Sequence, residues 1–134
     1  MAEMVMKHLV RKAGRERDFL IDSAAARSDE IGSGIHRGTR AKLMREGIPF
    51  TEHYARLVTR ADYAKYDVIV CMDEENKADL VRIFNGDSDG KVCKLLDFCG
   101  QHRDVADPWY TGNFDATYDD VTAGCEAILA AMAS

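Results

Sequence analysis

Tyr66-Asp67-Val68-Ile69-Val70-Cys71-Met72-Asp73 is the stretch of sequence that decides the fold. Three β-branched residues in a row are typical of a buried strand, so this run predicts a strand at the centre of a sheet. Asp73 is a residue type that caps helices, and the two glutamates after it suit the positive end of a helix dipole. Leu80, Val81 and Phe84 then give an apolar face. The stretch therefore predicts a strand that leads directly into a helix.

Two further strands are predicted on either side of this one. Phe19-Leu20-Ile21 is a short apolar run that ends in the polar pair Asp22-Ser23, and residues 91–96 form another apolar run. The six residues from Asn85 to Gly90 are typical of a turn. Strands that alternate with helices predict an α/β domain over residues 1–134, built on a parallel, doubly wound sheet.

Three more helices are predicted from the spacing of apolar residues. The first covers residues 1–12 and is closed by Gly14, and the second covers residues 39–46 and is closed by Gly47 as a left-handed cap. The third lies near the end of the chain, where apolar residues recur at helical spacing. The apolar faces consist of Met1, Met4, Val5 and Leu9 in the first helix and of Val121, Cys125, Ile128, Leu129 and Met132 in the last.

The composition is typical of a single globular domain without a disordered region. Hydrophobic residues make up 46% of the chain and charged residues 31%. A formal net charge of −5 argues against nucleic acid or an anionic membrane surface as a partner. No apolar run approaches the roughly 18 residues that a membrane helix needs, and no signal peptide is evident, so we expect a cytoplasmic protein.

The four cysteines show no paired spacing of the kind that binds metal ions. Cys71, Cys93, Cys99 and Cys125 all lie within or beside apolar runs, which favours reduced and mostly buried thiols. We therefore expect neither a metal ion nor another cofactor.

Ligands of parallel sheets bind at the carboxyl ends of the strands, which directs attention to Asp22-Ser23, Met72-Asp73 and the loop after Leu96. In that loop, Asp107-Pro108-Trp109-Tyr110 puts a carboxyl group beside two aromatic rings. An apolar surround would keep the carboxyl group protonated as a proton donor, and the rings could hold an aromatic substrate.

Each of these residues also has a purely structural explanation. Asp107-Pro108 is a common way to begin a turn, and the two rings after it could simply cover the core. Ser23 and Asp73 could serve as a helix cap or as hydrogen-bonding groups at a strand end. Taken one at a time, the segments do not decide between these readings.

Several short stretches taken together are more specific. They are Met1-Ala2-Glu3, Asp22-Ser23-Ala24-Ala25, Glu30-Ile31-Gly32, Arg37-Gly38, Gly47-Ile48-Pro49, Ala55-Arg56, Tyr66-Asp67, Cys71-Met72-Asp73-Glu74 and Asp107-Pro108-Trp109-Tyr110. In order and spacing they resemble the low-molecular-weight protein-tyrosine phosphatases over essentially the whole chain. The resemblance implies a three-layer α/β/α fold with four parallel strands in the order 2-1-3-4.

The resemblance also implies roles for particular residues. Asp107 matches the general acid that protonates the leaving phenol oxygen, and Trp109 and Tyr110 match the aromatic pocket, with Trp where Tyr is frequent. Ser23 and Asp73 match positions that brace the phosphate loop. Asp29 stands where an aromatic residue often lines the pocket entrance. The substrate implied is a phosphotyrosine-containing protein or an aryl phosphate, hydrolysed through a phosphocysteine intermediate without a metal.

One part of the family pattern is absent from these 134 residues. Members of this family resemble one another most in a strand followed by Cys-x5-Arg. The cysteine thiolate attacks phosphorus, and the arginine holds the phosphate oxygens. None of the four cysteines is followed six residues later by arginine, since those positions hold Lys77, Cys99, Val105 and Ala131. We therefore expect an N-terminally truncated domain without its first inner strand or its nucleophile, and hence an inactive chain.

The missing strand would leave two unpaired edges, near Leu20 and Ile69. We expect these edges either to close on each other or to be bridged by a second copy of the chain as a homo-oligomer. Two other functions stay open at this point. One is a non-catalytic interaction module, and the other is an arsenate reductase-like protein of the same fold, in which Cys93 and Cys99 would form a redox pair.

Overall fold

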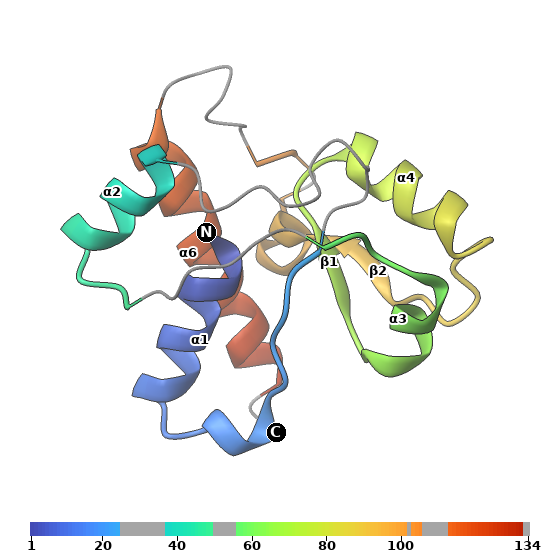
Figure 1. Ribbon diagram of the computed structural model, residues 1–134, viewed down its shortest axis with the longest axis horizontal. Coiled ribbons are helices and arrows are strands. Elements are labelled where there is room, and N and C mark those ends of the chain that lie inside the picture. The colour runs from blue at the N-terminus through green and yellow to red at the C-terminus, as the bar shows by residue number, and fades with distance from the viewer. Residues whose placement is uncertain (25–36, 50–55, 102, 106–112, 133–134) are drawn as a thin grey trace.

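The computed structural model describes residues 1–24, 37–49, 56–101, 103–105 and 113–132. Helices and 3₁₀ helices surround two short strands (Figure 1). In chain order the elements are helix α1 (Ala2–Lys12), 3₁₀ helix η1 (Glu16–Asp18), helix α2 (Arg37–Arg45), helix α3 (Arg60–Lys65), strand β1 (Ile69–Cys71), helix α4 (Glu74–Ile83), strand β2 (Val92–Lys94), 3₁₀ helix η3 (Leu95–Cys99) and helix α6 (Phe114–Ala131).

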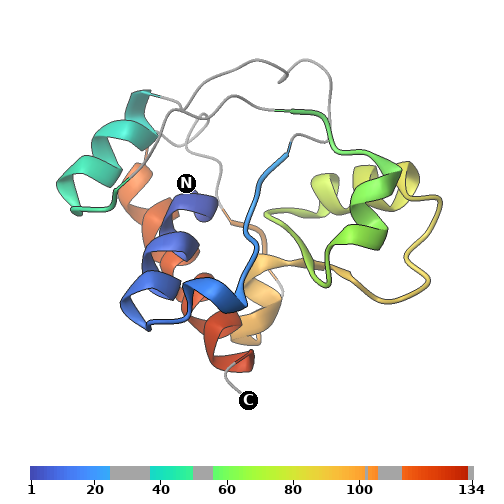
Figure 2. The same ribbon diagram turned by 60° about the horizontal axis from the view of Figure 1, so that its bottom comes forward.

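The two strands form a parallel sheet in which Ile69 lies opposite Val92 and Cys71 lies opposite Lys94. Side chains on a strand point alternately to opposite faces. Val70 accordingly packs against the hydrophobic cluster of α1 and α6, whereas Ile69 and Cys71 belong to a second cluster on the other face. Figures 1 and 2 show α1, α2 and α6 on one side of the strands and α3 and α4 on the other. The predicted α/β/α layering with a parallel sheet is confirmed.

The larger hydrophobic cluster is built where α6 packs against α1 and η3. Its most deeply buried side chains are less than 2% exposed and come from several elements that are far apart in the sequence. The buried members of this cluster are Met4, Val5, Met6, Val10, Leu43, Ile48, Leu95, Leu96, Val105, Val121 and Cys125. The predicted apolar faces of the first and last helices therefore meet each other.

The smaller cluster lies under α3 and α4. Its buried members are Val58, Cys71, Leu80 and Val92. The ring of Tyr63 packs against Phe84 with its centroid 5.1 Å away. This cluster fixes α4, and with it the helix N-terminus that follows β1.

The strand predicted at Phe19-Leu20-Ile21 is not formed, and this prediction is wrong. The run is extended and keeps the alternation of a strand, because Phe19 and Ile21 pack against the larger cluster while Leu20 is 69% exposed. Among the described residues, the sheet contains β1 and β2 alone. No described strand pairs with this segment, and a strand needs a paired neighbour.

The third predicted strand is shorter than expected, because Leu95 and Leu96 begin η3 rather than ending β2. Asp97 explains this early end, since its carboxylate accepts a hydrogen bond from the Lys94 backbone N–H at 2.9 Å and so caps the 3₁₀ turn. The predicted helix ends agree better with the structure. Gly14 and Gly47 both have left-handed backbone angles, with φ of 69° and 68°.

Candidate active site

The carboxyl ends of β1 and β2 lie side by side and place two charged residues at this edge of the sheet. Asp73 follows β1, and its carboxylate accepts a hydrogen bond from the Asn76 backbone N–H at 2.7 Å. Asp73 therefore caps α4, as the sequence predicted. Lys94 is the last residue of β2, opposite Cys71. The edge thus combines the positive end of a helix with a lysine ammonium group.

The ammonium group of Lys94 is enclosed by acidic partners. Its Nζ lies 3.0 Å from Asp104 Oδ1 and 3.9 Å from Glu74 Oε2, and the lysine side chain is 9% exposed. The same Asp104 oxygen accepts a hydrogen bond from the Glu74 backbone N–H at 3.1 Å. The hydrogen bond to Asp104 raises the pKa of Lys94, so the ammonium group stays charged.

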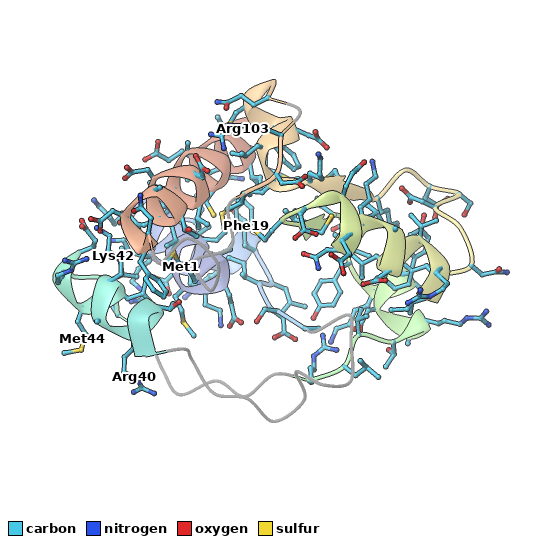
Figure 3. All side chains as sticks on the ribbon, turned by 90° about the horizontal axis from the view of Figure 1, so that it is seen from above. Met1, Phe19, Arg40, Lys42, Met44 and Arg103 are labelled. Atoms are coloured by element: carbon cyan, nitrogen blue, oxygen red, sulfur yellow. The ribbon has the colours of Figure 1, made fainter. Side chains whose placement is uncertain are left out.

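The segment on either side of Asp104 is tied to two other elements. The guanidinium group of Arg103 donates two hydrogen bonds to Asp120 of α6, at 2.9 and 2.7 Å. Figure 3 shows Arg103 beside α6, next to the ribbon of η3. The Val105 backbone N–H donates to the Met72 carbonyl oxygen at 2.9 Å, and the Val105 side chain is buried in the larger cluster.

Ser23 hydrogen-bonds to a carboxylate of α1. Its hydroxyl group donates to Glu3 Oε1 at 2.5 Å, and Glu3 Oε2 lies 2.7 Å from Lys7 Nζ. The Glu3 side chain is 7% exposed, so this is a mostly buried, ion-paired carboxylate. Of the two residues that the sequence singled out together, Ser23 thus bonds to a side chain of α1 and Asp73 to the backbone of α4. Each is held in one orientation by its own helix.

Arg56 connects three segments that are distant in the sequence. Its guanidinium group lies 3.1 Å from Asp22 and 3.0 Å from Asp62, and the Tyr66 hydroxyl group donates to Asp22 at 3.4 Å. Partial burial acts to raise the pKa of Asp62, but hydrogen bonds from Arg56 and from the Thr59 backbone N–H outweigh it and lower the pKa. This network ties residue 22, just before Ser23, to the N-terminus of α3.

The four thiols are free, and those of Cys71 and Cys125 are buried. Burial raises the pKa of each of these two thiols to about 12, and burial also raises the pKa of Cys93. A nucleophilic cysteine needs a lowered pKa, so these three thiols have the opposite character. Cys71 Sγ instead donates to the Cys93 carbonyl oxygen at 3.3 Å. These contacts support a structural role for Cys71.

The other four site residues named from the sequence, Asp29, Asp107, Trp109 and Tyr110, lie outside the described residues. Their predicted roles stay predictions. The described chain resumes at Asn113, whose side-chain oxygen accepts a hydrogen bond from the Ala116 backbone N–H at 3.0 Å and so caps α6. Both ends of the segment that carries Asp107 are thus fixed to the body of the domain.

No group of three histidine, cysteine, aspartate or glutamate side chains among the described residues is placed to hold a metal ion. No helix in the described part of the chain has the length and apolar character needed to cross a membrane.

Sequence reasoning found Ser23 and Asp73 but missed the charged residues around them, which are Glu3, Arg56, Lys94 and Asp104. Lys94 carries a usable signal, because it is a charged residue between Cys93 and Leu95 in an apolar strand run that ends at the ligand-binding edge. Asp104 and Glu3 carry no such signal, since they meet their partners only after folding. Arg56 lies 34 residues from Asp22 in the sequence, and nothing local connects the two.

The fold and the edge just described define an α/β/α domain with a ligand-binding edge at the carboxyl ends of parallel strands. Residues 1–134 match the family described as Low molecular weight phosphotyrosine protein phosphatase. The chain is 37% identical over 134 residues to the low molecular weight protein-tyrosine-phosphatase YfkJ of Bacillus subtilis, covering 98% of this chain and 86% of that protein. It is 33% identical to PtpA of Staphylococcus aureus, covering 96% of this chain and 82% of that protein.

Solved structures agree with these sequence relations. The crystal structure of Bacillus subtilis YfkJ superposes with a TM-score of 0.93 at 36% identity, covering 98% of this chain and 84% of that one. The low molecular weight protein tyrosine phosphatase SP-PTP of Streptococcus pyogenes superposes with a TM-score of 0.88 at 31% identity, covering 99% and 83%. The chain therefore belongs to the low-molecular-weight phosphotyrosine protein phosphatase family.

Proposed function

We propose that this domain supplies the general acid and the substrate pocket of a protein-tyrosine phosphatase. Asp107 would be the general acid, and Trp109 and Tyr110 would form the pocket. The observation that carries the proposal is the hydrogen bond from the Val105 N–H to the Met72 carbonyl oxygen at 2.9 Å. Val105 is two residues before Asp107, and Met72 is the first residue beyond β1. This contact brings the chain to the edge where parallel sheets bind ligands just before the proposed acid.

The chemistry that fits this arrangement is transfer of a phosphoryl group to a thiolate. The thiolate forms a bond to phosphorus while the bond from phosphorus to the phenol oxygen breaks, and Asp107 gives its proton to that oxygen. The oxygen of a water molecule then attacks phosphorus while Asp107, now the base, takes a proton from that water. The bond from phosphorus to sulfur breaks, which restores the thiolate and releases inorganic phosphate. Asp29 would lie at the pocket entrance, and Ser23 and Asp73 would support the loop that carries the nucleophile.

We further propose that the 134 residues do not perform this reaction by themselves. They contain no Cys-x5-Arg, and burial raises the pKa of three of their four thiols. A missing nucleophile and a missing phosphate-binding arginine remove effects worth several powers of ten in rate. The absence of turnover in this chain would therefore not contradict the family assignment.

The decisive experiment compares two polypeptides with aryl phosphate as substrate. The 134-residue chain is expected to show no hydrolysis above background, and a chain extended upstream to include a strand and Cys-x5-Arg is expected to be active. Turnover by the 134-residue chain that is abolished by Asp107→Asn would show that one of its own residues is the nucleophile. An inactive extended chain that nevertheless binds phosphopeptide would favour the interaction module.

We also propose that the 134-residue chain self-associates through the segment around Leu20 and the edge of β1. Leu20 is 69% exposed on an extended segment, and β1 pairs only with β2 among the described residues. The segment around Leu20 forms no strand ladder with β1 in the described chain, and this supports pairing with a second copy as the alternative that we propose. Sedimentation is expected to show a dimer that Leu20→Lys weakens, and a monomer at all concentrations would contradict this.

A further inference from the structure

Three consecutive residues just before the Asp107 segment each bond to a different part of the domain. Arg103 reaches α6, Asp104 reaches the end of β2 and the start of α4, and Val105 reaches the residue after β1. We call residues 103–105 the anchor. These four contact points tie the anchor to α6, β2, α4 and the residue after β1.

Arg103 ties the anchor to α6. Its Nη1 and Nη2 atoms lie 2.9 and 2.7 Å from the two oxygens of Asp120, a paired contact that fixes both distance and orientation. The Asp120 side chain is 18% exposed and lies on α6, an 18-residue helix. The anchor is therefore tied to a rigid element rather than to another loop.

Asp104 ties the anchor to the ligand-binding edge. Its Oδ1 atom accepts hydrogen bonds from the Lys94 ammonium group and from the Glu74 backbone N–H. Lys94 lies in the β ladder and is largely buried, so its position is set by the sheet. Glu74 is the first residue of α4, so Asp104 also neutralises the positive end of that helix.

Val105 completes the anchor by burial. Its side chain is 5% exposed and packs in the larger hydrophobic cluster, while its N–H bonds to Met72. A chain advances at most about 3.6 Å per residue. The Cα atom of Asp107 can therefore lie no more than about 7 Å from that of Val105, and that of Trp109 no more than about 14 Å.

We propose that Lys94, Asp104, Arg103 and Asp120 are positioning residues, which fix the starting point and direction of the segment that carries Asp107, Trp109 and Tyr110. The effect of this positioning on catalysis rests on the proposed role of Asp107. The positioning itself concerns the 134-residue chain as it stands and can be tested without turnover. Lys94 acts through Asp104, and Asp120 acts through Arg103.

Trp109 makes the test direct, because it is the only tryptophan in the chain and stands in the segment under test. Asp104→Ala and Lys94→Met are each expected to shift its fluorescence emission to the red and to raise its acrylamide quenching constant about twofold, as for a segment that opens locally. The double variant is expected to match Asp104→Ala, because that change alone already removes the ion pair with Lys94. Asp104→Asn keeps an acceptor for the Glu74 N–H, so its effect should be smaller.

Arg82→Met is the matched control. Arg82 also forms an ion pair with an aspartate, Asp79 at 3.2 Å, but near the opposite end of α4 from Glu74. Its Trp109 emission and quenching should equal those of the wild type. Arg103→Gln tests the second contact independently and should produce the same change in Trp109 as Asp104→Ala.

Three outcomes of these measurements have different meanings for the proposal. Wild-type Trp109 emission and quenching in Asp104→Ala and Lys94→Met, with intact far-ultraviolet circular dichroism, would overturn the proposal. Loss of the helical signal in both would also overturn it, because the pair would then hold the fold and not the segment. Altered Trp109 signals together with an inactive extended chain would contradict the proposed phosphatase function and leave the anchor standing.

Discussion

The side chain of Leu95 occupies the space where a β-carbon would stand on Gly124. A Cβ atom built on Gly124 overlaps two atoms of Leu95 and comes within 3.0 Å of a third. Leu95 is 1% exposed and Gly124 is buried, so neither has room to move. This contact is what allows η3 and α6 to lie so close together.

Gly124→Ala should therefore destabilise the domain. Helix propensity alone would favour alanine by about 1 kcal/mol, but overpacking against Leu95 should cost about 1 to 3 kcal/mol. Urea unfolding of the variant measures the difference. Ala123→Gly, one residue away at an exposed position, supplies the propensity effect without the steric one. An alanine variant more stable than the wild type would contradict the packing argument.

The network around Arg56 should make stability depend on pH. The folded-state pKa of Asp62 is lowered, so its ionisation stabilises the fold above its unfolded pKa near 4, and this contribution is lost as pH falls through the lowered value. Asp62→Asn should lower the free energy of unfolding by about 1 to 2 kcal/mol at pH 7, and the difference should shrink below about pH 4. Asp18→Asn, at an exposed ion pair, is the control.

The buried thiols should be unreactive in the folded chain. With a pKa of about 12 for Cys71 and Cys125, roughly one thiol in 3 × 10⁴ is ionised at pH 7.5, and burial blocks access as well. Iodoacetamide labelling followed by peptide mass spectrometry should leave both unmodified until urea is added. Labelling of Cys71 in the native chain at a rate above that of a free thiol would revive it as a candidate nucleophile.

The proposed general acid can be tested in the upstream-extended chain. Asp107→Asn should lower kcat most for phenyl phosphate, whose leaving phenol needs a proton, and by about 10²-fold or more. It should lower kcat much less for an aryl phosphate whose phenol leaves readily as an anion. An equal loss for both substrates would indicate a structural role for Asp107. Asp104→Asn serves as a comparison, because it changes the anchor without removing the acid.

Much of the fold could be predicted from local sequence, and the exceptions have physical reasons. The β-branched run before Asp73 and the cap itself are local signals, and both are confirmed in β1 and α4. The run at Phe19 has the same local character but forms no strand, because strand formation depends on a neighbour that the run does not specify. Helix α3 has six residues, too few to show a period, although its Thr59-x-x-Asp62 capping box is visible in the sequence.

The candidate site was predicted less completely. Ser23 and Asp73 were found because they follow apolar runs, a position that local pattern reveals. Lys94 and Asp104 lie ten residues apart, and their ion pair depends on how η3 turns the chain back after β2. Charge partners across a turn of this kind leave no periodic trace in the sequence, so only the folded arrangement reveals the anchor.

The alternation of β1 between two hydrophobic clusters has a consequence for insertions and deletions. Removing one residue between Lys65 and Ile69 would slide the strand by half its side-chain repeat, so Val70 would turn toward α4 and its neighbours toward α6. Each of the two hydrophobic clusters would then receive side chains that fit the other cluster. The register of this three-residue strand thus decides which side chains enter each of the two hydrophobic clusters. Insertions or deletions in the short link before it should therefore be far less tolerated than substitutions there.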